Sequence, residues 1–288
     1  MSVEVRPAVA DDIDQIVDLL YGHMSQKLSP ERWRNILDYP WRPADADRGC
    51  VAVDNGRVVG FLGLVYADRP IDGRTTRFCN ICAWYLLKSH RGQGIGQRIQ
   101  FASVADPAMT YTIMTATAAT GQAFGTNSGF KVLDDSRYLL RRRGGSADLE
   151  ISEGAIGEKL APKDRALFED HRRYNMRHLL LRAGEGSCYV AMQVKRKGDD
   201  IDYHEVMYAS DRRFLAAHAQ ALADTILTGE KSVLAIDKRF VERFLVPGAP
   251  AWESETLRLP RWYRSATVPP AQIDHLYGEV ALLDLKLP

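Results

Sequence analysis

The most informative stretch of the chain is "ICAWYLLKSHRGQGIGQR", in which an apolar run leads into a glycine-rich turn. The run predicts a buried strand, and the apolar spacing after the turn predicts an amphipathic helix. Gly92, Gly94 and Gly96 stand at this junction, directly behind Arg91. Glycine permits positive φ angles and leaves space for a ligand beside the backbone. Because the first N–H groups of a helix have no partner within it, the junction predicts an anion site, best suited to a pyrophosphate.

Two well-known phosphate loops do not match this stretch. A P-loop needs G-x-x-x-x-G-K-[ST], and no lysine follows the glycines here. A dinucleotide-binding turn needs G-x-G-x-x-G after a parallel strand, whereas the spacing here is G-x-G-x-G in an antiparallel context. The pattern that remains is R-x-x-G-x-G, which "RGQGIG" matches from Arg91 to Gly96.

The elements expected around the junction form a mixed α/β fold with a mostly antiparallel sheet flanked by helices. Before the junction the sequence predicts a strand in "VEVRPA", a helix after Asp11, a hairpin turning at "DNG" and a strand at 77–87. After it come the helix "GQRIQFASVA", a strand at 111–118, a short helix that ends at Gly129, and a last strand region from 131.

This order of elements, the R-x-x-G-x-G loop and the later Gly129-Phe130 pair resemble the GNAT superfamily of acyl-CoA-dependent N-acyltransferases over about residues 3–142. The resemblance implies that acetyl-CoA is the co-substrate, with its pyrophosphate on the loop amides and its pantetheine beside the preceding strand. A backbone amide there would polarise the thioester carbonyl, and a substrate amine would attack it directly. The cofactor-binding residues implied are Trp84, Tyr85, Leu86, Arg91, Gly92, Gln93, Gly94, Ile95 and Gly96.

The catalytic residues are less clear than the CoA loop. Amines are mostly protonated at neutral pH, so a base is useful. Many relatives carry a glutamate on the strand before the loop, but the aligned residue here is Asn80, which can position a water or an amine without accepting a proton. His90 is titratable, although a surface histidine beside Arg91 is the alternative interpretation, and the same holds for His23.

The resemblance also leads us to expect a tyrosine that protonates the leaving thiolate, four residues before the glycine of the "GF" pair. That position is Gly125, and the asparagine that usually begins the helix is replaced by Ala118 or Thr120. Tyr85 is left as a candidate for the proton donor. The candidate catalytic residues are therefore Asn80, Tyr85 and His90, and the broken pattern keeps a catalytically weak acyl-CoA-binding or sensing protein as an alternative.

The second half of the chain predicts a further α/β domain. The polar stretch 142–158 carries four glycines, which suggests a GNAT-like domain at 1–142, a linker at 143–158 and a C-terminal domain at 159–288. We expect a helix in "PKDRALFEDHRRYNMRHLL", strands in "SCYVAMQVK", "IDYHEVMYA" and "SVLAI", and a strand or helix–strand junction in "LYGEVALLDL". Its strand–helix junction, "SDRRFLAAH", has no glycine and begins with Asp211, whose carboxylate would cap the helix and repel a pyrophosphate. This half is expected to be a degenerate GNAT-like domain without a CoA loop, or otherwise a mixed α/β domain.

Composition narrows the partners. Lys+Arg (38) and Asp+Glu (37) nearly cancel, which argues against a nucleic-acid partner. No apolar run reaches the roughly 20 residues that span a bilayer, and "MSVEVRPAVADDID" contains no secretion signal, so no membrane partner and a cytoplasmic location are expected. Cys79 and Cys82 match C-x-x-C, but residues three apart on a strand face opposite sides, which favours buried thiols over a redox or metal pair.

Taken together, the sequence predicts an enzyme, an N-acetyltransferase that moves an acetyl group from acetyl-CoA to an amine of a small molecule. Acylation of a protein or peptide amine is the alternative among enzymes. We expect no metal, and either a monomer or a homodimer.

Overall fold

The computed structural model describes residues 3–145, 148–246 and 252–288, and the chain divides into two compact units. Unit 1 comprises Met1–Leu133, Leu259–Gln272 and Tyr277–Pro288, and unit 2 comprises Asp134–Arg258 and Ile273–Leu276. This division differs from the expected boundaries at 142 and 158, because two segments from the end of the chain belong with the first 133 residues. Residues 146–147 of the expected linker lie outside the described residues.

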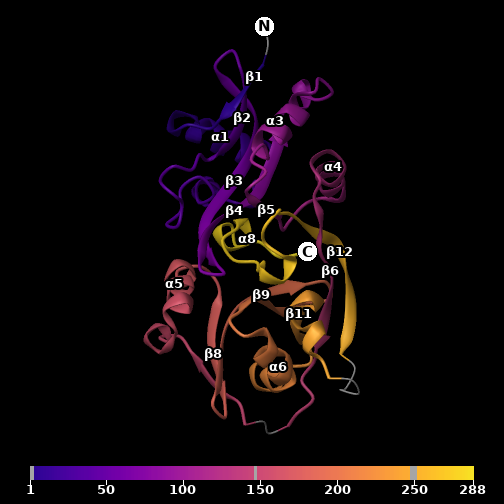
Figure 1. Cartoon of the computed structure of the whole chain (residues 1–288). Helices are drawn as coiled ribbons and strands as arrows, with labels where there is room; N and C mark the ends of the chain where they lie inside the picture. The colour runs from indigo at the N-terminus through magenta and orange to yellow at the C-terminus, as the bar shows by residue number, and fades with distance from the viewer. Residues whose placement is uncertain (1–2, 146–147, 247–251) are drawn as a thin grey trace. The chain divides into compact units, whose positions relative to one another are not determined.

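The strands of unit 1 form a sheet in which neighbours are antiparallel except for one pair (Figure 1). In spatial order they are β1 (Glu4–Pro7), β2 (Gly49–Asp54), β3 (Arg57–Ile71), β4 (Arg74–Leu86), β5 (Thr110–Ile113) and the last residues of β12 (Glu253–Arg264). The parallel pair is β4 with β5. The β2–β3 hairpin turns at Asn55 and Gly56, both with positive φ, which confirms the turn predicted from "DNG".

Helices cover both faces of this sheet. They are η1 (Ala10–Asp12), α1 (Ile13–His23), α2 (Pro30–Arg34), η2 (Lys88–His90), α3 (Ile95–Ser103), α4 (Ala118–Ser128), η5 (Pro270–Gln272) and α8 (Glu279–Leu282). Ile95 and Ile99 of α3 and Phe124 of α4 join one core with β-strand residues such as Leu62 and Leu64. α1 also packs on β3 but contributes nothing to that core, so it covers the opposite face (Figure 1).

The described strands of unit 2 are likewise antiparallel to their neighbours except for one pair. In spatial order its strands are β6 (Lys131–Leu140), β11 (Ser232–Asp237), β10 (Ile201–Ala209), β9 (Gly186–Lys197), β8 (Arg177–Ala183) and β7 (Glu150–Glu153). Its helices are η3 (Gly157–Lys159), α5 (Pro162–His171), α6 (Arg212–Ile226), α7 (Lys238–Val241) and η4 (Glu242–Phe244). The parallel pair is β10 with β11.

The two units repeat one order of elements. In unit 1 the hairpin β3–β4 leads into α3 and then into β5, which lies parallel to β4. In unit 2 the hairpin β9–β10 leads into α6 and then into β11, parallel to β10. Each central strand contains a bulge, near Ala83 in β4 and between Val206 and Tyr208 in β10. The shared order and the shared bulge support a common architecture for the two units.

Several expectations about elements are wrong. The helix expected over 162–180 ends at His171, and the apolar residues that follow Arg177 form β8, which pairs with strands on both sides. The strand expected at 111–118 ends at Ile113, because Thr117 caps α4 by accepting a hydrogen bond from the Thr120 N–H. Of the strand or helix–strand junction expected in "LYGEVALLDL", only a helix, α8, is present, and the sequence did not predict β7 or β12.

In the part of the chain that the structure describes, no helix combines the length and the apolar character needed to cross a membrane.

Candidate active site

The candidate site lies in unit 1, where β4 and β5 stop sharing hydrogen bonds. Their ladder pairs Phe78–Asn80 with Thr110–Thr112, after which β4 continues to Leu86 while β5 ends at Ile113. Beyond the ladder, β4 carries one residue more than β3 between Cys82 and Tyr85, and Ala83 has a φ of 48°. A bulge of this kind turns backbone groups out of the ladder and makes them available to a ligand.

The glycine loop after β4 leaves the start of α3 open. Gly92 and Gly94 have φ angles of 76° and 75°, a conformation that favours glycine. Gly94 precedes the first residue of α3, no side chain caps this end, and its first turn contains no acidic residue. The N–H groups and the helix dipole at this end therefore favour an anion.

The corresponding end of α6 in unit 2 is closed. Asp211 precedes α6, and its Oδ1 accepts a hydrogen bond from the Phe214 N–H at 2.9 Å. The carboxylate satisfies an N–H group that an anion would otherwise bind, and it adds negative charge. The prediction that Asp211 caps this helix is confirmed.

Around the loop, Tyr85 and Arg91 lie close together. The guanidinium of Arg91 is 5.3 Å from the centre of the Tyr85 ring, and its Nε donates a hydrogen bond to the Leu86 carbonyl at 3.0 Å. The ring of Tyr85 stacks on His23, with 6.1 Å between ring centres. Three residues that the sequence singled out separately, His23, Tyr85 and Arg91, therefore form one cluster.

Trp84 and Gly96 bind α3 to the sheet. A Cβ on Gly96 would lie 3.6 Å from the Trp84 indole, so the ring rests directly on the helix backbone. The indole also meets the Phe124 ring of α4 edge-on, with 5.5 Å between the ring centres. The side chain of Trp84 thus packs between two helices, and its backbone lies in the bulge of β4.

His90 is held away from the β4–β5 divergence by partners of its own. Its Nε2 is 3.2 Å from Asp54 Oδ2, and its Nδ1 is 2.9 Å from the Ser89 hydroxyl. These contacts tie His90 to the end of the β2–β3 hairpin, and among the described residues none links it to Asn80. The geometry favours the alternative of a surface histidine over a catalytic one.

Asn80 is buried, with 4% of its surface exposed, and it connects three elements. Its Nδ2 donates to the backbone oxygen and the hydroxyl of Thr112 on β5, at 3.4 and 3.3 Å. Its Oδ1 accepts a hydrogen bond from the Glu279 N–H at 3.0 Å, at the start of α8. Asn80 therefore anchors the end of the chain at the point where β4 and β5 part.

Glu279 is the acidic residue that sequence reasoning missed. Its side chain is buried, and its Oε1 accepts a hydrogen bond from the Thr115 hydroxyl at 2.8 Å. Burial raises the pKa of this carboxyl to about 7, even though hydrogen bonds from Thr115 oppose the shift. A lone glutamate inside the apolar run "YGEVALLDL" was the available signal, because glutamate is rarely buried without a specific environment.

Gly125, the position expected to carry a tyrosine, packs against the indole of Trp262 instead. A Cβ on Gly121 would lie 2.3 Å from Trp262 Nε1, and a Cβ on Gly125 would lie 3.2 Å from the same ring. The two glycines are one turn apart on α4, so together they form the surface on which Trp262 of β12 packs. Any side chain at Gly125 would press on that indole.

The Cys79 and Cys82 thiols are both buried and free, which confirms the buried-thiol interpretation of the C-x-x-C pair. Burial raises the pKa of each thiol well above its usual value, and the nearby Glu279 carboxylate adds to the effect at Cys82. Both sulfurs therefore stay protonated at neutral pH.

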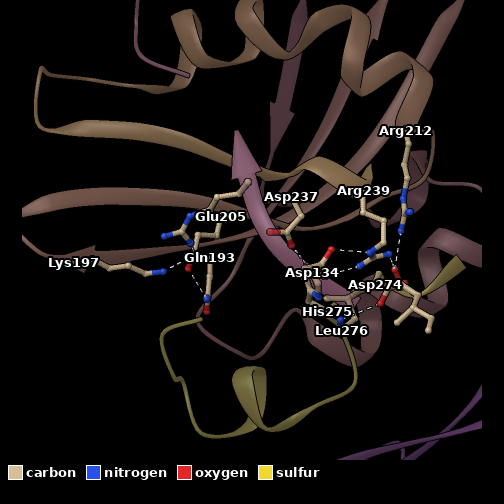
Figure 2. A network of polar contacts seen from close by, with 12 residues as sticks. Asp134, Gln193, Lys197, Glu205, Arg212, Asp237, Arg239, Asp274, His275 and Leu276 are labelled. Atoms are coloured by element: carbon tan, nitrogen blue, oxygen red, sulfur yellow. Dashed lines mark hydrogen bonds and ion pairs between the residues drawn. The ribbon is translucent and has the colours of Figure 1, made fainter. Parts of the chain in front are cut away.

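Unit 2 also has a buried carboxylate on its bulged strand β10, that of Glu205, but this carboxylate forms ion pairs with two cationic side chains (Figure 2). Glu205 accepts hydrogen bonds from Arg137 at 2.8 Å, Lys197 at 2.6 Å and Gln193 at 3.0 Å. Arg137 and Lys197 thus form ion pairs with this buried carboxylate. β10 therefore carries a buried, ion-paired glutamate, whereas β4 carries the uncharged Asn80.

A second polar cluster of unit 2 fastens residues 273–276. His275 Nε2 lies 2.5 Å from Asp237 Oδ2, and Arg239 donates two hydrogen bonds to Asp134, at 2.8 and 2.9 Å (Figure 2). Ligand atoms of Asp134, Asp237 and His275 lie within 4.8 Å of one another, a spacing that could hold a metal ion. The guanidinium of Arg239 already supplies positive charge at Asp134, so the cluster is explained as an ion-pair network.

Comparison with known proteins bears on the family and the fold. Residues 13–101 match the model of the acetyltransferase (GNAT) family. No curated protein matches the chain. The similar solved structures include GCN5-related N-acetyltransferases from Anabaena variabilis (TM-score 0.59, 12% identity, 91% of this chain and 72% of that one) and Kribbella flavida (0.55, 12%, 91% and 71%). Eis1 from Mycobacterium abscessus has a TM-score of 0.51 at 13% identity, over 92% of this chain and 73% of its own.

Residues 13–101 therefore match a GNAT acetyltransferase domain, as the sequence predicted. At such low identities the solved structures establish the fold, which is mixed α/β and GNAT-like over most of the chain.

Proposed function

We propose that this protein transfers an acetyl group from acetyl-CoA to an amine of a small molecule. The observation that carries the proposal is the open N-terminus of α3 behind the bulged strand β4, set against the capped N-terminus of α6. Backbone N–H groups between Arg91 and Gly96 would hold the pyrophosphate, and the bulge near Ala83 would present an N–H to the thioester carbonyl. Unit 2, with Asp211 across its helix end, would not bind CoA in this way.

The reaction needs little from the protein beyond positioning, charge stabilisation and proton transfer. The amine nitrogen attacks the carbonyl carbon, the C–S bond breaks, and its electrons leave with the sulfur. A backbone N–H aimed at the carbonyl oxygen stabilises the charge that develops there, an effect worth about 3–4 kcal/mol in comparable sites. The positive charge of Arg91 favours binding of acetyl-CoA, the acetyl donor, because its phosphate groups are negatively charged.

A small acceptor is favoured over a protein chain by the closeness of the packing. Where β4 and β5 part, Asn80, Thr112 and Glu279 are 4%, 5% and 1% exposed. A protein segment would need a wide, open groove at this point, whereas a small amine would need only a narrow opening.

Binding and transfer can be measured separately. Calorimetric titration with acetyl-CoA should give a dissociation constant between about 1 µM and 1 mM, the range common for enzyme substrates. A thiol-reactive dye should then detect CoA release that depends on a small amine. Absence of CoA binding would contradict the proposal, and release with peptides alone would point to a protein acceptor.

The second candidate is a protein that binds acyl-CoA without turning it over. It is favoured by Trp262, which packs on Gly125, the position where the family resemblance leads us to expect the tyrosine that protonates the thiolate. Tight CoA binding with no acceptor-dependent thiol release would support this candidate.

A further inference from the structure

The start of α8 is fitted closely to β4. The Glu279 N–H donates to Asn80 Oδ1 at 3.0 Å, and a Cβ on Gly278 would lie 2.8 Å from the same oxygen. A side chain at residue 278 would therefore displace the helix from the strand. Gly278 and Asn80 together bring Glu279 to the place where the β4–β5 ladder ends.

The Glu279 carboxyl is only half satisfied there. Oε1 accepts from the Thr115 hydroxyl, whereas Oε2 is buried and has no hydrogen-bond partner among the described residues. Buried polar atoms are almost always hydrogen-bonded, so an unsatisfied one calls for an explanation. A donor carried by a ligand would provide one.

The main influences on the pKa of this carboxyl are its burial and hydrogen bonds to it, and no described cation is among them. From β4 it faces Asn80 and the Cys82 thiol, which stays neutral because burial raises its pKa. After β5 it faces the neutral hydroxyl of Thr115. This setting differs from that of Glu205 in unit 2, which accepts from Arg137 and Lys197.

We propose that Glu279 is the general base of the transfer reaction, with Asn80 as its positioning residue; the inference rests on the proposed function. Oε2 takes one proton from the acceptor nitrogen as that nitrogen attacks the thioester carbon. The C–S bond breaks, the thiolate gains one proton from water, and Glu279 returns its proton to water. The proton balance closes with one amide and one thiol formed.

Asn80 and Glu279 together account for the absence of a carboxylate on β4. Asn80 stands where the resemblance places a glutamate, and it holds the backbone of a glutamate from α8 instead. Burial gives that carboxyl a pKa of about 7, and a base of this strength is effective near neutral pH.

The test compares Glu279→Gln with Asp284→Asn, which removes a negative charge from the same C-terminal segment. Glutamine keeps the shape and the hydrogen bond from Thr115, so the variant should fold and bind acetyl-CoA within about twofold of wild type. We expect kcat/KM for the amine to fall by about 10²–10⁴-fold, and the acid limb of its pH profile, centred near pH 7, to disappear. Asp284→Asn should retain both the rate and the limb.

Unchanged kcat/KM, or an acid limb that persists in Glu279→Gln, would overturn the assignment. A second measurement does not depend on turnover: difference infrared spectroscopy of wild type against Glu279→Gln follows this one carboxyl through its titration. The titration is made on the protein without CoA or acceptor, and we expect a midpoint near pH 7. A midpoint near 4.5 together with acceptor-dependent transfer would refute Glu279 as the base and leave the proposed function standing. Failed CoA binding would refute the proposed function and, with it, the role of Glu279 in transfer.

Discussion

At the scale of single residues, Asn80 and Glu279 show how a buried site can be assembled from distant parts of a chain. They are 199 positions apart and joined by one hydrogen bond from the Glu279 N–H. Because the carboxyl is withdrawn from water, the neutral form is favoured and its pKa rises to about 7 from a usual 4.5. The same burial that suits Glu279 to proton transfer also makes it sensitive to pH.

This sensitivity predicts a pH-dependent stability. Between about pH 4.5 and 7 the folded protein retains the Glu279 proton that the unfolded chain has lost, so this group's contribution to the free energy of unfolding falls as the pH rises. The loss is at most about 3 kcal/mol by pH 8, at 1.36 kcal/mol for each unit of pKa. Glu279→Gln should remove it, which urea unfolding of both proteins at pH 5 and pH 8 would measure. Parallel behaviour of the two proteins across this range would contradict the burial argument.

At the scale of elements, the contact between α4 and β12 depends on two glycines. Gly121 and Gly125 present bare backbone on one face of α4, and the Trp262 ring lies on it. Glycine normally weakens a helix interior, by about 1 kcal/mol relative to alanine. The position of the indole explains why the helix keeps both.

Alanine at these positions tests the contact. Gly121→Ala would place a Cβ 2.3 Å from Trp262 Nε1, and we expect a net loss of about 1–3 kcal/mol in the free energy of unfolding despite the gain in helix propensity. Gly125→Ala, at 3.2 Å, should cost less. In a Trp262→Ala background both changes should become stabilising by about 1 kcal/mol, and chemical denaturation gives each value. Stabilisation by Gly121→Ala in the wild-type background would exclude the packing described.

Elements with local signals could be predicted from the sequence. The turn at Asn55-Gly56, the end of α4 at Gly129 and the Asp211 cap each depend on residues adjacent in the chain. β8 was mistaken for helix because its apolar residues are consecutive, and only pairing with β7 and β9 makes it a strand.

As with the elements, only those parts of the candidate site that depend on residues close together in the chain could be predicted from the sequence. The glycine loop could be predicted from the spacing of its glycines, whereas Glu279 and Trp262 reach the candidate site through contacts with Asn80 and Gly121 that no local pattern encodes. The broken family pattern at Gly125 was visible in the sequence, but the indole that accompanies it was not.

At the scale of the whole molecule, the chain returns to its first unit near its end. Leu259–Gln272 and Tyr277–Pro288 belong to unit 1, and Ile273–Leu276 between them belongs to unit 2. The last strand of unit 1 and the proposed base are therefore both supplied by the final 30 residues. The N-terminal part of the chain alone does not contain the complete GNAT-like unit.

A fragment of residues 1–142 should consequently fail to fold like the full chain. It lacks β12 and α8, so Asn80 loses its partner at Glu279 and Gly121 loses the indole that packs on it. We expect no cooperative thermal transition by circular dichroism, or one well below that of the full chain. A fragment that melts cooperatively at the temperature of the full chain would show that the first 142 residues are an independent domain.

The binding of CoA and of pantetheine by wild type and by Gly94→Asp tests the phosphate site most directly. An aspartate at this position would give α3 the kind of carboxylate that Asp211 gives α6, and Gly73→Asp is a matched control on a hairpin turn with nearly the same φ, 77° against 75°, and equally open space. Calorimetry should show CoA affinity reduced about 100-fold, or about 2.7 kcal/mol, in Gly94→Asp alone, with pantetheine affinity unchanged because pantetheine has no pyrophosphate. Unchanged CoA affinity, or an equal loss for pantetheine, would contradict pyrophosphate binding at the start of α3.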